Sequence, residues 1–244
     1  MPELHIQGTA GEVAQAAAEF VAGLAEESQS TQNRFTIALS GASTPLPLYR
    51  LLASSPWAGR IAWDRWHIFW GDERCVPPDH QDSNYRMAKE AMLDHIPIPA
   101  GQVHRMKGEV GPQEAAEEYE TVVRDVFQTP VPSFDLILLG VGDDGHTASL
   151  FSGTEALEEK HRLVVANWVP HLDAHRITFT LPLINAARAV AFLDTDGSKA
   201  DTLRRVLEPS PGEDMPPAAK VRPADGTVHW FLTREAAGRL ESLE

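Results

Sequence analysis

Cysteine is almost absent from this chain of 244 residues, whose only thiol is Cys75. A single cysteine excludes an internal disulfide, so a hydrophobic core must hold the fold together. The chain also lacks a run of about 18 apolar residues and a signal-peptide pattern, which argues against a transmembrane helix and against secretion. We therefore expect a cytoplasmic protein with no membrane partner.

Positive charge is scarce as well. Lysine and arginine total 21 against 35 for aspartate and glutamate, which gives a formal net charge of −14 at pH 7. Nucleic acids and anionic membranes both require a basic protein face to neutralise their phosphates, so we expect neither as a partner. A small anion remains compatible, because a few local cations suffice to bind it. We find no sequence signal for an oligomeric partner.

Apolar residues, by contrast, make up 43% of the chain, enough for a sizeable core. Short apolar, β-branched runs alternate with amphipathic stretches, which is the pattern of a mainly parallel sheet with helices on both faces. We expect one α/β domain over residues 1–244, with a single doubly wound, Rossmann-like sheet. The predicted strands are 35–40, 66–71, 134–140, 162–168, 176–182, 189–195 and 228–233.

Helices are expected between most of these strands. The first should follow Thr9 and bury a face with Val13, Ala17, Phe20, Val21 and Leu24. Others should begin near Thr44, Ser83, Pro112 and Gly197, and the last should follow Thr233. The stretch 208–226 is rich in proline, glycine and acidic residues, so we expect a mobile surface loop without catalytic residues.

In open α/β sheets, ligands bind outside the carboxyl ends of the strands, so the residues after each strand are informative. The first such loop is Ser40, Gly41, Ala42, Ser43 and Thr44. Thr44 suits a helix N-cap and Pro45 suits the first helical turn. Backbone N–H groups, small hydroxyls and the positive helix end could form an anion site. The alternative is an ordinary capped helix start.

The second loop follows Gly71 and is crowded with charge: Asp72, Glu73, Arg74, Asp79 and Asp82. Arg74 could make a plain surface ion pair, worth less than about 1 kcal/mol. Its position at a strand's carboxyl end favours a role in the site instead. No base is placed near Cys75 in the sequence, so we expect that thiol to be inert.

The third loop has Gly140, Gly142 and Gly145 at the spacing G-x-G-x-x-G of dinucleotide-binding proteins. Asp143 and Asp144 would repel a pyrophosphate there, and the loop lies halfway along the chain rather than after the first strand. We therefore predict no nucleotide cofactor. The glycine turn is better suited to project His146 as a general base, with Asp143 or Asp144 fixing its tautomer. A structural or exposed histidine is the alternative.

Two more cations occupy comparable positions. Arg176 opens a predicted strand, and Lys199 lies in the first turn of a predicted helix, where the helix dipole disfavours a cation. An anionic ligand would offset that cost, whereas ion pairing with Asp196 or Asp201 is the alternative. His171 and His175 are four residues apart, but they are expected in a loop before a strand, so we assign no metal to them.

Taken in order, these loops resemble the motifs of the 6-phosphogluconolactonase family. The stretches that carry the resemblance are LSGASTPLPLYRLL, WGDERCVPPDHQDSNYRMAKEAML, LGVGDDGHTASLFSG, RITFTLPLINAA, DGSKADTL and VHWFLTREAAGRL. The second and third are specific, and together the matches cover essentially the whole domain. The departures are minor: Ala42 stands where the family usually has glycine, and Ser152 where it often has proline.

The resemblance implies hydrolysis of 6-phospho-D-glucono-1,5-lactone to 6-phosphogluconate in the oxidative pentose phosphate pathway, without metal or cofactor. It also implies a fold shared with glucosamine-6-phosphate deaminase. The family's catalytic histidine falls on His146, which would activate water. Asp144, or its neighbour Asp143, would orient the ring, and Arg74, itself among the expected phosphate and sugar contacts, is a candidate to stabilise the oxyanion. Substrate contacts would involve Ser40, Gly41, Ala42, Ser43, Thr44, Asp72, Arg176 and Lys199.

Two other functions fit the same motifs less well. A sugar-phosphate deaminase or isomerase should have an acidic residue shortly after the glycine–histidine triplet, but no carboxylate occurs there before Glu155. A catalytically silent sugar-phosphate sensor would not need His146 and would normally carry an effector domain.

Overall fold

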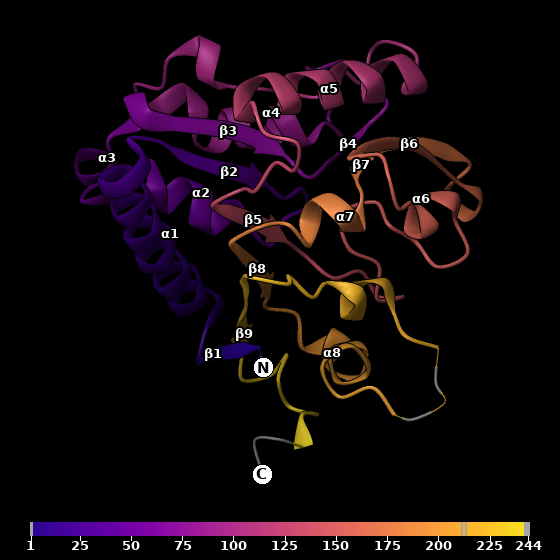
Figure 1. Cartoon of the computed structure of the whole chain (residues 1–244). Helices are drawn as coiled ribbons and strands as arrows, with labels where there is room; N and C mark the ends of the chain where they lie inside the picture. The colour runs from indigo at the N-terminus through magenta and orange to yellow at the C-terminus, as the bar shows by residue number, and fades with distance from the viewer. Residues whose placement is uncertain (1, 211, 213, 242–244) are drawn as a thin grey trace.

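The computed structural model describes residues 2–210, 212 and 214–241, and its centre is a six-stranded parallel sheet (Figure 1). The strand order is β1-β9-β8-β5-β2-β3, and every neighbouring pair is parallel. A mainly parallel sheet is thus confirmed. Its strands are β1 (Glu3–Gln7), β2 (Phe35–Leu39), β3 (Trp66–Trp70), β5 (Leu136–Leu139), β8 (Ala189–Asp194) and β9 (Thr227–Thr233).

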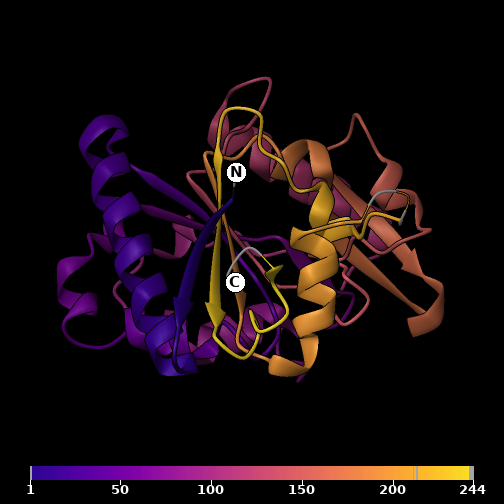
Figure 2. The ribbon, with the colours of Figure 1, turned by 90° about the horizontal axis from the view of Figure 1, so that it is seen from below.

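Helices cover both faces of this sheet, so its inner strands are apolar on both sides. In Figure 2 the sheet is seen nearly edge-on, with α1 (Ala10–Gln32) on one side and α8 (Ala200–Leu207) on the other. Two buried clusters form the core, one on each face. The remaining helices are α2 (Leu46–Leu52), α3 (Trp57–Arg60), α4 (Asn84–Ala91), α5 (Pro112–Phe127), α6 (Glu155–Glu158) and α7 (Leu181–Ile184).

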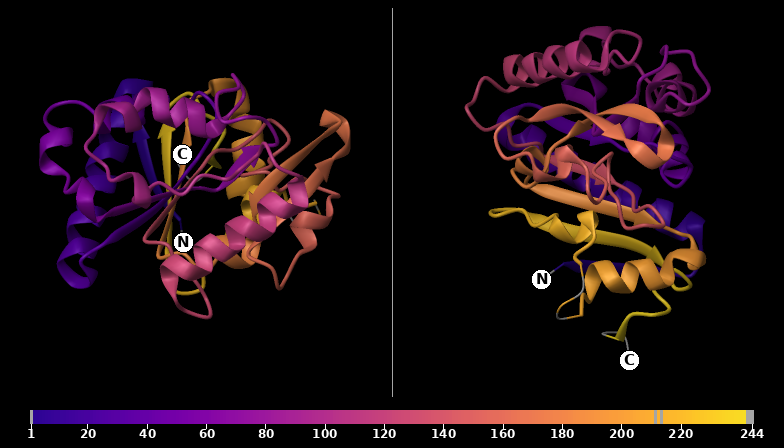
Figure 3. Two further views of the ribbon diagram at one scale, coloured as in Figure 1. Left: turned by 90° about the horizontal axis from the view of Figure 1, so that it is seen from above. Right: turned by 90° about the vertical axis from the view of Figure 1, so that its right-hand side faces the viewer.

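The expectation of one sheet is wrong in one respect, because three strands form a second, antiparallel sheet. Its order is β4 (Asp72–Arg74), β7 (Ala174–Phe179), β6 (Val164–Val169), and it projects beside the large sheet (Figure 3). Only residues 170–173 connect β6 to β7, whereas a parallel crossover needs about a dozen or more residues. The hairpin therefore cannot join the parallel sheet as two successive strands.

Most of the predicted helix starts are confirmed. Thr9 caps α1, Ser83 caps α4, and Pro112 is the first residue of α5. Two predictions are wrong. Pro45, not Thr44, is the N-cap residue of α2 and makes no side-chain cap bond, since the chain already turns through the Leu46 N–H bond to the Ser43 carbonyl. After Thr233 the chain forms consecutive turns rather than a helix.

The stretch 208–226 is only partly the surface loop that its composition suggests. Residues 211 and 213 lie outside the described residues. A short 3-10 helix, Pro217–Lys220, buries Ala218 and Ala219 against the core, and Val221 follows them inside. Apolar burial thus fixes the second half of this stretch. Among the described residues, no helix is long and apolar enough to cross a membrane.

Candidate active site

A cleft of about 770 Å³ opens where the carboxyl ends of β2, β3, β5 and β8 meet. Parallel strands bring their carboxyl ends to one edge of the sheet, so four loops far apart in sequence converge there. Ser43 is exposed and is not among the lining residues. The other predicted site residues all line the cleft: Ser40, Gly41, Ala42, Thr44, Asp72, Arg74, Asp144, His146, Arg176 and Lys199.

His146 is held by Asp144, which resolves the choice between the two neighbouring aspartates. Asp144 Oδ1 lies 2.6 Å from His146 Nδ1 and also accepts the His146 backbone N–H at 3.0 Å. Burial opposes ionisation of Asp144, but these hydrogen bonds and the imidazole's charge outweigh it and hold the pKa of the carboxyl below its usual range. An ionised carboxylate can only accept, so in the neutral imidazole the proton is on Nδ1 and Nε2 carries the lone pair.

The glycines of this loop make room for His146. A Cβ on Gly142 would lie 2.1 Å from the imidazole, and Gly145 has φ +83°, a conformation that L side chains rarely adopt. The Gly142 N–H donates to the His146 carbonyl at 2.9 Å and closes the turn. The ring then stacks on Phe151, with centroids 4.1 Å apart. The G-x-G-x-x-G spacing therefore has a local reason that involves no nucleotide.

The segment around Pro216 and Ala218, distant in sequence, packs against the same loop. A Cβ on Gly145 would lie 2.6 Å from Pro216, and the Ala218 N–H donates to the Gly145 carbonyl at 3.0 Å. The stretch that was expected to lack chemistry thus packs directly against the turn that presents His146.

Asp72 lies in a buried hydrogen-bond network at the floor of the cleft. Its Oδ2 accepts from the Ser149 hydroxyl at 2.7 Å, and Asn84 Nδ2 donates to its backbone carbonyl at 2.9 Å. The neighbouring Glu73 turns the other way and accepts the backbone N–H groups of Asn84 and Tyr85, both at 2.8 Å, at the start of α4. Asp72 therefore belongs to the cleft, whereas Glu73 anchors a helix.

Two arginines meet on the small sheet. Arg74 and Arg176 are direct partners in the antiparallel pairing of β4 with β7, and both line the cleft. Burial lowers the pKa of Arg176, and the charge of Arg74 lowers it further. Among the described residues neither guanidinium makes an ion pair within 4.0 Å; each donates to a backbone carbonyl, that of Asp82 or of His175.

Lys199 lies at the junction of a 3-10 turn (Gly197–Lys199) and α8. Its Nζ donates to the Val141 carbonyl at 2.9 Å and lies 3.5 Å from Oδ2 of the buried Asp194. That oxygen has no hydrogen-bond partner in the described structure, so the contact is a charge pairing without a good hydrogen bond. Asp196 and Asp201, the partners expected as alternatives, form no ion pair with Lys199 within 4.0 Å; Asp201 lies near Arg239 instead.

Ala42 shows why its position favours glycine. Its φ is 66°, in the left-handed region, where an L residue is strained. The preceding residue, Gly41, is equally constrained, since a Cβ there would lie 2.1 Å from Asn84 Oδ1. The loop therefore needs small residues to approach α4 closely.

Cys75 and the histidine pair need no catalytic explanation. Burial raises the pKa of the Cys75 thiol, which disfavours the reactive thiolate. His171 lies in a 3-10 turn (Pro170–Leu172) with its ring edge-on to Phe151, while His175 lies in β7 against Trp168. The two are thus not on one helix face, which removes the sequence pattern for a metal pair.

Several cleft residues escaped the sequence reasoning. They were missed for different reasons. Ser149 reaches Asp72 from 77 positions away, whereas Phe151 and Asp194 contact His146 and Lys199 only five positions away but were not singled out by residue type. The lining residues in this group are Asn84, Ser149, Phe151, His171, Leu172 and Asp194.

A parallel sheet with a cation-lined cleft outside its carboxyl ends defines an α/β protein suited to a small anionic ligand. The family model described as Glucosamine-6-phosphate isomerases/6-phosphogluconolactonase matches residues 8–230, so the chain belongs to that family.

Individual proteins agree with this membership. The chain is 44% identical over 214 residues to a 6-phosphogluconolactonase of Nostoc sp., with 86% of each chain covered. It is 32% identical to the solved structure of 6-phosphogluconolactonase from Trypanosoma cruzi, with a TM-score of 0.89 over 99% of this chain and 97% of that one. A monomeric glucosamine-6-phosphate deaminase, 22% identical, shares the fold with a TM-score of 0.80 over 97% and 99%.

Proposed function

We propose that this chain, acting as one α/β domain, hydrolyses 6-phospho-D-glucono-1,5-lactone to 6-phospho-D-gluconate. The observation that carries the proposal is the combination in one cleft of His146, oriented by Asp144, with Arg74 and Arg176. Among the described residues, no carboxylate lies within 4.0 Å of either guanidinium as an ion pair. A base that can activate water and cations that can hold a phosphate are what a phosphorylated ester requires. The relatives named 6-phosphogluconolactonase support the same reaction.

In the proposed mechanism, His146 Nε2 accepts a proton from water as the water oxygen attacks the lactone carbonyl carbon. The carbonyl oxygen takes the electron pair and becomes an oxyanion, which Arg74 would stabilise. Collapse of this intermediate breaks the bond to the ring oxygen, and the imidazolium returns its proton to that oxygen. Asp144 keeps Nδ1 protonated and stabilises the charged ring between the two steps.

The substrate phosphate is assigned to Arg176, Lys199 and the N–H groups of the Ser40–Thr44 loop. Arg74 and Arg176 face each other across the pair of β4 and β7, and like charges directly opposite repel. A bound anion would reduce that repulsion. Charge-assisted bonds of this kind contribute roughly 1.5 to 3 kcal/mol each. Two or three of them would make the phosphorylated lactone the strongly preferred substrate.

Every proton transfer in this mechanism uses a protein side chain, so we propose that turnover requires neither metal nor nicotinamide cofactor. The test is lactone hydrolysis measured against the spontaneous background, with glucosamine-6-phosphate deamination measured on the same preparation. We expect saturable acceleration of hydrolysis and no ammonia release. Ammonia release without lactone hydrolysis would assign the chain to the deaminase branch, and saturable lactone binding without turnover would make it a sensor.

A further inference from the structure

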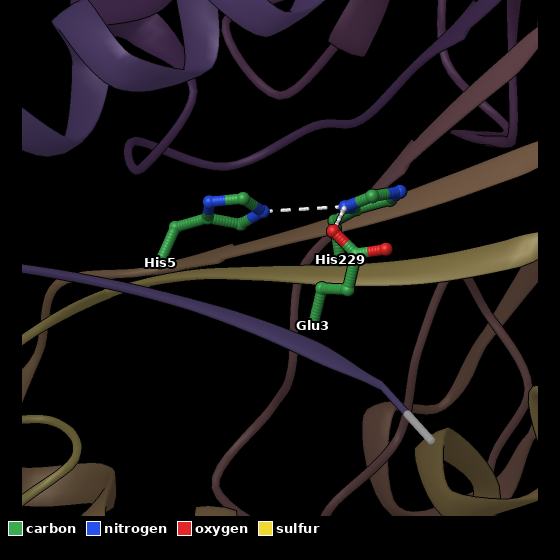
Figure 4. Close-up of side chains that lie close together, drawn as sticks. All are labelled: Glu3, His5 and His229. Carbon is green, nitrogen blue, oxygen red and sulfur yellow. Dashed lines mark hydrogen bonds and ion pairs between the residues drawn. The ribbon is translucent and has the colours of Figure 1, made fainter.

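Three potential metal ligands gather at an edge of the large sheet, outside the cleft. His5 Nε2 lies 3.2 Å from His229 Nδ1, and Glu3 Oε2 lies 3.4 Å from the same His229 nitrogen (Figure 4). The three ligand atoms all lie within 4.8 Å of one another. Among the described residues this is the one group of three or more histidine, cysteine or acidic side chains with that geometry.

The strand pairing places these side chains together. β1 pairs in parallel with β9, and Glu3 is the direct partner of His229. His5 is two residues further along β1, so it points to the same face as Glu3. Aromatic contacts also hold the two imidazole rings. His5 stacks on Phe231 with ring centroids 4.4 Å apart, and the ring centroid of Phe20 in α1 lies 4.4 Å from that of His229. The arrangement is thus preformed by packing.

Two of the three ligand separations suit a tetrahedral metal. Zn²⁺ binds imidazole nitrogen at about 2.0–2.1 Å and carboxylate oxygen at about 2.0–2.2 Å, so two ligand atoms on one tetrahedral ion lie roughly 3.3–3.5 Å apart. The separations of 3.2 and 3.4 Å come close to that edge length. Two imidazoles and one carboxylate are also the donor set that favours Zn²⁺ over Ca²⁺ or Mg²⁺.

The remaining nitrogen of His229 has the partner that a metal-binding histidine usually has. His229 Nε2 lies 2.8 Å from the Thr227 hydroxyl. When Nε2–H donates to that oxygen, Nδ1 presents its lone pair toward His5 and Glu3. The pair His67 and His104 provides a comparison inside the chain: its nitrogens are 3.1 Å apart, but among the described residues no carboxylate completes a group of three there.

We propose that Glu3, His5 and His229 bind one Zn²⁺ ion, with water in the fourth position, and that this ion fastens the edge strand β1 to β9. Glu3 begins β1, whereas the cleft lies beyond the carboxyl ends of the parallel strands. The ion is therefore structural, and its removal leaves turnover unchanged. The inference does not depend on the proposed lactonase activity.

The experiment uses the full chain, stripped of metal with a chelator and titrated with Zn²⁺ by calorimetry. We expect one ion per chain, a rise in Tm of roughly 5 °C or more at about a hundredfold excess over Kd, and visible absorption bands of tetrahedral cobalt when Co²⁺ replaces Zn²⁺. Because Glu3 is exposed and His5 only partly buried, Glu3→Gln and His5→Gln should fold and should each weaken Zn²⁺ binding at least tenfold.

The matched control is His67→Gln. It removes one histidine of the His67–His104 pair, which has no carboxylate beside it to complete a group of three among the described residues, and should leave the Zn²⁺ affinity unchanged. Lack of saturable binding by the wild-type chain would overturn the proposal. So would binding that survives both Glu3→Gln and His5→Gln, because the ion would then occupy other histidines. Lactone hydrolysis is measured in parallel, and equal rates with and without Zn²⁺ are expected.

Discussion

Arg74 and Arg176 face each other across the antiparallel pair of β4 and β7, in a chain whose formal net charge is −14. Carboxylates are plentiful in this protein, yet among the described residues none forms an ion pair with either guanidinium. The repulsion between the two arginines is consistent with a site that an anionic ligand completes. The chemistry of the ligand then follows from what else lines the cleft, above all His146.

Lys199 should act on the phosphate of the substrate. We expect Lys199→Ala to lower kcat/KM for the phosphorylated lactone by roughly 10- to 100-fold, the value of one charge-assisted bond, and to change kcat/KM for glucono-1,5-lactone less than about threefold. The measurement is kcat/KM of both enzymes on both lactones.

Two controls are needed to interpret this comparison of two enzymes on two lactones. Thermal unfolding must show that Lys199→Ala stays folded, because the substitution leaves the buried Asp194 without its cation. Lys220→Ala, which removes a lysine paired with Glu158 outside the cleft, should behave as wild type on both substrates. Equal losses on both lactones with Lys199→Ala would show that Lys199 does not bind the phosphate.

Gly142→Ala should displace the imidazole of His146, because the added Cβ would lie 2.1 Å from the ring. We expect kcat to fall by about 10²-fold, since a misplaced base can lose two orders of magnitude in rate. The matched control is Gly101→Ala, where nothing lies within 4 Å of the new Cβ. A Gly142→Ala enzyme as active as Gly101→Ala would show that His146 does not need its observed position.

Ala42→Gly should stabilise the protein slightly. Relief of the left-handed strain at φ 66° raises the free energy of unfolding by about 1–2 kcal/mol. The greater backbone freedom of glycine in the unfolded chain lowers it by about 0.5–1 kcal/mol. We expect a net gain of about 0.5 kcal/mol in the free energy of unfolding, measured with denaturant. The control is Ala53→Gly, at φ −81°, where there is no strain to relieve and the free energy of unfolding should fall. A fall of similar size with Ala42→Gly would contradict this account.

His104 should make the protein less stable in mild acid. Burial, together with a smaller effect of the neighbouring His67, lowers its pKa to about 4. Between the unfolded value of about 6.5 and about pH 4, the unfolded chain binds a proton that the folded chain does not. The free energy of unfolding should therefore fall as the pH drops through this window.

Denaturant unfolding of wild type and His104→Gln over this pH range tests the assignment. The variant should lose stability less steeply, whereas His161→Gln, at an exposed position, should follow the wild-type slope. A His104→Gln slope identical to wild type would place the acid sensitivity elsewhere.

The parallel sheet could be predicted because its inner strands are buried on both faces and therefore read as continuous apolar runs, as in Phe35–Leu39. The two strands that were missed lack that signal. β1 is an edge strand with partly exposed residues, and β4 is three charged residues long. The predicted strands 162–168 and 176–182 left seven residues between them, too few for a parallel crossover. Their antiparallel pairing could therefore have been predicted but was not.

Cleft residues could be predicted where they lie in the stretch that follows a buried strand, as His146 and Arg74 do. Contacts distant in sequence could not. Ser149 reaches Asp72 across 77 positions, and His5 reaches His229 across 224, with no spacing rule that connects either pair. The choice of Asp144 over Asp143 likewise depended on side-chain geometry, not on residue type.

The most direct test of the central claim is kcat for hydrolysis of 6-phospho-D-glucono-1,5-lactone by wild type and His146→Ala, each corrected for spontaneous hydrolysis. With a general base removed, kcat should fall about 10²- to 10⁴-fold while substrate binding changes little, and His161→Ala should keep the wild-type rate. A His146→Ala enzyme that retains more than about a third of wild-type kcat would contradict the assignment of His146 as the base.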